Sequence, residues 1–244
     1  MYFFNLFITW CLFISVTYAW TTQIEPSLVE DWPLTVNIRD TIEGYYENIV
    51  DEVLSTNSEV FLLDLTHMRS IQSGRLRLEA SQLGLKNVND DCLFKMPGII
   101  AQNVHQLNEQ VFGSIDGLVS TYLPLLLPRQ LSTLDDRRLD ELLQSINQAM
   151  VFELIQKMQN YELSSRIIHE MKLCQTGAVT DNKFASQVQR WLAFAGPKSI
   201  VPKGTSAVDR FSQTTRLHLT SALHARLSDL QSLISEDLRD EFNI

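Results

Sequence analysis

Glycine and proline are scarce in this chain, which holds nine and seven of them among its 244 residues. Strict alternation of apolar and polar residues, the pattern of a half-buried strand, is confined to short stretches such as 75–78 and 216–219. Elsewhere apolar residues recur every three or four positions, which is the period of one helix face. The sequence therefore predicts an all-α fold, an irregular bundle of about five to six long amphipathic helices with one disulfide.

Charged side chains are absent from the first nineteen residues. Their apolar stretch, 3–16, is interrupted by polar residues and is too short to span a bilayer comfortably. Thr17 and Ala19 place small residues three and one positions before Trp20, as a signal-peptide cleavage site requires. We therefore expect 1–19 to be a signal peptide and 20–244 to be a single all-helical, secreted, extracellular domain. Two sub-bundles with a linker near 196–205 are the alternative.

No apolar run after the leader reaches membrane-spanning length, so we expect no stable membrane insertion. Basic residues are also few, 20 against 29 acidic ones, and they form no cluster. A chain with a net charge of −9 and no basic patch is poorly suited to bind nucleic acid or an anionic membrane. We expect no nucleic-acid partner.

Cysteine is nearly absent, since Cys11 lies in the leader and only Cys92 and Cys174 follow it. In an oxidising compartment two cysteines most simply pair, so we expect a Cys92–Cys174 disulfide. Two separate thiols or a disulfide between molecules are the alternatives. Straight helices on either side of the connection 124–131 would leave the cysteines mismatched by roughly 15 Å. We therefore expect the later helix to bend near Asn160; a meeting of the flanking loops is the other solution.

Caps and small residues give further expectations about the helices. Asn89–Asp91 and Ser206 are expected to cap the helices that follow them. Leu78 is expected on the apolar stripe of its helix. Gly113 and Gly117 lie one turn apart and are expected to let a neighbouring helix approach closely, with a hinge as the alternative. The periodicity predicts helices at 40–55 (starting as early as Pro33), 58–83, 92–122, 133–173 (breaking between 160 and 165), 181–195 and 206–240.

Recognisable catalytic and metal-binding motifs are missing. None of the five histidines has another three or four positions away, so no helix presents a two-histidine metal face. The serine in 113–117 does not have the spacing of a nucleophile elbow, and 196–205 lacks the spacing of a phosphate loop. His105, His169 and Glu170 lie on the helices that the cysteines join, and we interpret them as ordinary polar residues. We predict no catalytic residue, metal ligand or cofactor.

What remains is apolar helix surface. We expect a secreted, non-enzymatic helical binding or interaction protein, whose partner is an unidentified protein or a hydrophobic small molecule. A carrier of a small hydrophobic ligand is the alternative, because Met150, Met158 and Met171 have flexible side chains that suit irregular cavities. A hydrolase with an unfamiliar site is a third option. The apolar connector 122–131 is expected to be buried; if exposed, it would mark a contact site.

Overall fold

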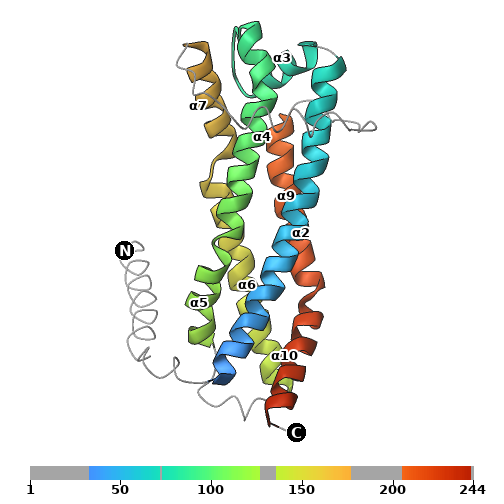
Figure 1. The fold of residues 1–244 in the computed structure, drawn as a ribbon, viewed down its shortest axis with the longest axis vertical. Helices are drawn as coiled ribbons and strands as arrows, with labels where there is room; N and C mark the ends of the chain where they lie inside the picture. The colour runs from blue at the N-terminus through green and yellow to red at the C-terminus, as the bar shows by residue number, and fades with distance from the viewer. Residues whose placement is uncertain (1–32, 72, 127–135, 177–204, 243–244) are drawn as a thin grey trace, which may run out of the picture.

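The computed structural model describes residues 33–71, 73–126, 136–176 and 205–242, and it is all-α, as the sequence predicts. No strand occurs among these described residues. Their long helices form four arms that run up, down, up and down (Figure 1). A further helix, α3 (Ser73–Gln82), lies beyond the end of the first arm. The arms are α2 (Pro33–Ile71), α4 (Asp90–Phe112) with α5 (Ile115–Leu126), α6 (Asp136–Asn160) with α7 (Leu163–Gln175), and α9 (Ala207–Ala225) with α10 (Leu227–Phe242).

The four arms surround a shared core. The α2 arm packs against α4 and α5 on one side and against α9 and α10 on the other. The arm made of α6 and α7 packs against the same two arms from the opposite corner. The first and last arms of the described chain therefore lie side by side, which brings α10 next to the beginning of α2 (Figure 1).

Buried side chains from all four arms form one hydrophobic cluster. In α2 the residues Ile42, Tyr46 and Ile49 are at most 2% exposed, which confirms the apolar stripe predicted for 40–55. The prediction for Leu78 is wrong, because Leu78 is 58% exposed while Leu76 is buried. At about 100° per residue, Leu76 lies only roughly 20° around the helix from the buried Leu65, whereas Leu78 lies roughly 220° from it, so Leu76 and not Leu78 continues the buried stripe.

Both predicted helix caps are confirmed. The side chain of Asn89 accepts a hydrogen bond from the backbone N–H of Cys92 at 2.8 Å, at the start of α4. The hydroxyl of Ser206 accepts one from the backbone N–H of Asp209 at 3.0 Å, at the start of α9. Each cap satisfies an amide that has no partner within its helix.

The disulfide and the bend that it requires are also present. Cys92, at the start of α4, is bonded to Cys174, near the end of α7, with the two Cα atoms 5.8 Å apart. The predicted bend is confirmed, because α6 ends at Asn160 and α7 begins at Leu163, with Glu162 in the left-handed conformation between them. This break lets the third arm bring its cysteine level with the first turn of α4.

The close approach predicted at Gly113 and Gly117 is wrong. Both glycines are exposed, and a Cβ atom on Gly117 would meet nothing within 4 Å. A Cβ atom on Gly113 would meet only the carbonyl oxygen of Glu109, from its own helix, at 3.0 Å. Gly113 instead marks the end of α4, so this pair punctuates the second arm and does not pack against a neighbour.

Several predictions lie outside the described residues. These are the leader, the helix at 181–195, the capping boxes at 132–136 and nearly all of the linker at 196–205. The connector 122–131 is described only as far as 126, where Leu123 is buried and Leu125 is half exposed. In the described part of the chain no helix has the length and apolar character needed to cross a membrane.

Candidate functional site

His105, His169 and Glu170, which we interpret from the sequence as ordinary polar residues, form no shared metal site among the described residues. His105 lies 3.1 Å from Glu109 on its own helix, whereas Glu170 accepts a hydrogen bond from Asn103 at 3.1 Å. His169 is exposed on α7. In the ranges that the structure describes, no group of three or more histidine, cysteine or acidic residues is arranged to hold a metal ion. His105, His169 and Glu170 thus have the environments of surface and boundary residues.

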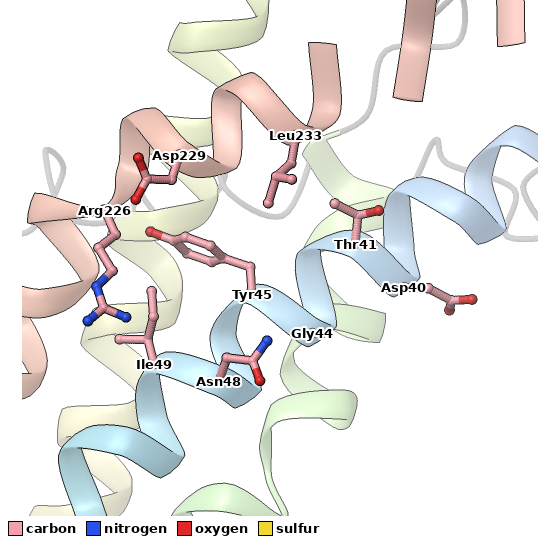
Figure 2. A pocket seen from close by; sticks show the side chains of 9 residues that line it. All are labelled: Asp40, Thr41, Gly44, Tyr45, Asn48, Ile49, Arg226, Asp229 and Leu233. Carbon is pink, nitrogen blue, oxygen red and sulfur yellow. The ribbon is translucent and has the colours of Figure 1, made fainter. Parts of the chain in front are cut away.

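A groove of about 370 Å³ lies between α2 and the junction of α9 with α10 (Figure 2). The α2 residues recur at helical spacing, so their side chains share one face of that helix. The residues from the other arm also lie three or four positions apart, with Arg226 at the junction of α9 and α10 and the other two on α10. The lining residues are Asp40, Thr41, Gly44, Tyr45, Asn48 and Ile49 from α2, and Arg226, Asp229 and Leu233 from the other arm.

The middle of the groove is mostly apolar, and its two ends are charged. Leu233 of α10 and Thr41 of α2 extend from opposite walls, and the ring of Tyr45 extends along the groove toward Arg226 and Asp229 (Figure 2). Leu233 is 46% exposed, which is high for a leucine beside a packed core. Arg226 and Asp229 lie at one end and Asp40 at the other (Figure 2).

Cross-helix hydrogen bonds hold the two walls in place. The phenol of Tyr45 donates to the backbone carbonyl of Leu223 at 3.1 Å, near the end of α9, where carbonyls lack partners within the helix. The hydroxyl of Thr41 donates to the Asp237 carboxylate at 2.6 Å. These contacts fix the separation of α2 from α9 and α10 at both ends of the groove, which is therefore a preformed feature of the bundle.

A buried polar network lies deeper in the bundle, one residue along from Tyr45. The hydroxyl of Tyr46 donates to the side-chain oxygen of Asn147 at 3.3 Å, and Asn147 also contacts His224 Nδ1 at 3.1 Å. Asn147 is 1% exposed, so these partners satisfy an amide that would otherwise be buried without hydrogen bonds. The network joins α2, α6 and α9 and locks the position of α9 just before the groove.

Electrostatics in the groove keep its phenol protonated. Burial and the nearby charge of Asp229 raise the pKa of Tyr45 to about 12, although Arg226 acts in the opposite direction. Tyr45 is therefore a hydrogen-bond donor at neutral pH. Arg226 is already engaged by Glu52, with N–O distances of 2.8 and 2.9 Å, and this contact lowers the pKa of Glu52.

The net charge of the protein is concentrated on the two helices that form the groove. Seven acidic residues against two arginines in α2, and five against one in α10, leave these helices with a net charge of −9. That value equals the formal net charge of the whole chain. Neither helix contains a lysine. We call the exposed sides of α2 and α10, with the groove between them, the acidic face.

Burial and neighbouring acids both act on Glu43, which lies on the acidic face. The pKa of Glu43 is raised by partial burial and by the charges of Asp116, Glu47 and Asp40, while Arg39 opposes the shift. Asp40 and Asp229 are exposed to solvent at the edges of the groove. The acidic face thus has unneutralised carboxylates available to a cationic partner.

Sequence reasoning missed this site. Asp237 contacts Thr41 and Arg226 contacts Glu52 across the helix pair, and no local sequence pattern predicts either contact. A residue-by-residue charge profile would have identified 33–71 and 227–242 as unusually acidic. Only the packing of the arms shows that these two segments are neighbours.

No family model matches this chain, and searches of curated proteins and of solved structures gave no match. The geometry and charge of the acidic face are therefore the basis for a functional assignment.

Proposed function

We propose that this chain is exported and acts as an extracellular, non-enzymatic interaction protein that binds a basic protein partner through its acidic face. The observation that carries the proposal is the concentration of the whole net charge on α2 and α10. Charge of one sign gathered on one side attracts partners of the opposite sign and speeds their association. The leader and the disulfide support export, because disulfides persist in oxidising compartments.

Stability alone gives no reason for such a face. Like charges on neighbouring helix turns repel each other and destabilise the compact state by small increments. Spreading the same acids over all four arms would reduce this repulsion. A basic partner would neutralise the acidic face on binding and so relieve the repulsion between its like charges. This relief favours the bound state.

The test measures binding of an arginine-rich, helix-forming peptide by fluorescence anisotropy. The acidic-face variant combines four neutralising substitutions, and the control combines four on acids of the other arms, three of them exposed and one partly buried. We expect the acidic-face variant to bind about tenfold more weakly, as four exposed ion pairs of roughly 0.2–1 kcal/mol would give. The acidic-face variant is Asp40→Asn, Glu47→Gln, Asp51→Asn and Glu236→Gln; the control is Asp91→Asn, Glu109→Gln, Asp140→Asn and Glu141→Gln.

The control separates a specific face from general attraction between opposite charges. Both variants lose the same amount of negative charge, so a uniform electrostatic effect would weaken binding equally in both. Equal weakening, or no binding by the natural protein, would refute the proposal. Binding that persists in the control and falls in the acidic-face variant supports it.

The carrier alternative has less support from the described residues. It was suggested by Met150, Met158 and Met171, which are all at most 6% exposed and belong to the continuous cluster of core side chains. Their flexible side chains fill space between α6, α7 and the other arms. Native mass spectrometry of protein from its source tests this alternative directly, because a carried lipid would add its mass.

A further inference from the structure

Gly44 lies in the middle of the longest helix, where glycine costs about 1 kcal/mol relative to alanine. Glycines persist in helices when a neighbouring group needs the space that a side chain would occupy. At Gly44 a Cβ atom would meet nothing within 4 Å. Packing among the described residues therefore does not explain the glycine, and its effect is to hollow the α2 wall of the groove.

The groove has an apolar middle and charged residues at both ends. Its middle offers Leu233, 46% exposed, opposite the hollow at Gly44. One end holds Arg226, which is occupied by Glu52, and Asp229, whose charge lies beside that arginine. The other end holds Asp40 and, through its contact with Thr41, Asp237. The matching occupant has an apolar stem for the middle and a cationic tip for the end with two carboxylates.

We propose that the groove receives a lysine or arginine side chain of the basic partner, with the aliphatic stem passing over Gly44 and Leu233 and the cation beside Asp40 and Asp237. This inference rests on the proposed function and goes further, because it names the chemical group that is recognised and its place. Long basic side chains bury their methylene stems along apolar surface and keep the charge outside it, which is what this groove allows.

The test compares two labelled peptides on the full exported chain. One carries arginine; the other carries 2-amino-3-guanidinopropionic acid, which keeps the guanidinium and lacks most of the aliphatic stem. We expect the natural protein to bind the arginine peptide about fivefold more tightly, since each methylene taken into an apolar site contributes up to about 0.8 kcal/mol and the groove is open. The difference in Kd between the peptides thus reports stem burial, with charge held constant.

Gly44→Leu blocks the groove in this test, and Gly44→Ala adds only a Cβ atom. Gly117→Leu is the matched control, because Gly117 lies in α5, does not line the groove, and its Cβ atom would also meet nothing within 4 Å. We expect Gly44→Leu to remove the preference for arginine, Gly44→Ala to reduce it, and Gly117→Leu to preserve it. Both leucine variants are expected to raise Tm, because leucine is the better helix former.

The outcomes separate the two proposals. A preference for arginine that Gly44→Leu abolishes and Gly117→Leu retains supports the groove. If the natural protein binds both peptides equally, or Gly44→Leu keeps the preference, the groove inference is overturned while the acidic face stands. If neither peptide binds, the proposal that the acidic face binds a basic partner is refuted as well.

Discussion

Glu79 shows how a single buried carboxylate can join two distant segments of this chain. It is 3% exposed, and it accepts backbone N–H groups from Ala207 at 2.8 Å and Val208 at 3.3 Å. These are the first amides of α9, which have no partner within their own helix. Glu79 therefore anchors α3 to the beginning of the fourth arm, where Ser206 supplies the local cap.

We expect Glu79→Ala to lower the free energy of unfolding by about 1–3 kcal/mol, because two buried N–H groups would lose their acceptor. The effect should depend on pH. Burial raises the pKa of Glu79 above its ordinary value of 4.5, although both backbone hydrogen bonds and Arg210 oppose the shift. A raised pKa means that the folded state favours the protonated acid, so its contribution is full below pH 4.5 and falls as pH rises through the folded-state pKa.

Urea denaturation of the natural protein and Glu79→Ala at several pH values checks both statements. Glu59→Ala, on an exposed part of α2, is the control and should change stability by less than about 0.5 kcal/mol. If the difference in free energy of unfolding between the natural protein and Glu79→Ala grows as pH rises, the pKa of Glu79 is not raised in the folded state.

At the level of the helices, the arms differ in where they break. α2 runs unbroken through 39 residues, whereas each of the other arms is divided into two helices. The breaks follow Phe112, Asn160 and Ala225. The break after Asn160 aligns the cysteines, and the break after Ala225 forms one end of the groove. The disulfide joins the interrupted third arm to α4, and the groove lies between the interrupted fourth arm and the continuous α2.

Glu162 carries the backbone strain of the break between α6 and α7. Its φ is 51°, in the left-handed region, and its side chain makes no capping hydrogen bond. We expect Glu162→Gly to raise the free energy of unfolding by about 0.5–1 kcal/mol, because glycine adopts this conformation without a steric penalty. Gln156→Gly, inside α6, should lower it by a similar amount. Chemical denaturation measures both, and destabilisation by both would show that the conformation of Glu162 is unstrained.

At the scale of the whole molecule, the disulfide closes the second and third arms into a loop with a sequence separation of 82 residues. Chain-entropy arguments give such a cross-link about 4.5 kcal/mol. We expect the double variant Cys92→Ala and Cys174→Ala to lose about that free energy of unfolding, and therefore to unfold at a lower denaturant concentration. Reduction of the natural protein should produce the same loss. If neither treatment changes the denaturation midpoint, the cross-link is not a source of stability.

Much of the local structure could be predicted from the sequence. Periodic apolar residues and the Asn89 and Ser206 caps were correct, because they depend on interactions within a few turns of helix. The cysteine pairing was also correct, because only two of the three cysteines follow the predicted leader, and the bend near Asn160 follows from that pairing. Leu78 was assigned to the wrong face of its helix, and the error at Gly113 arose where a helix ended.

The sequence by itself determined that this chain forms acidic, amphipathic helices, since composition and periodicity act through local propensity and burial. Only the tertiary structure decided that α2 and α10 are neighbours, which gathers the net charge on one face and encloses the groove at Gly44. The pairing of arms depends on contacts between residues far apart in the chain. Apolar stripes on helices look alike and do not specify which stripe meets which.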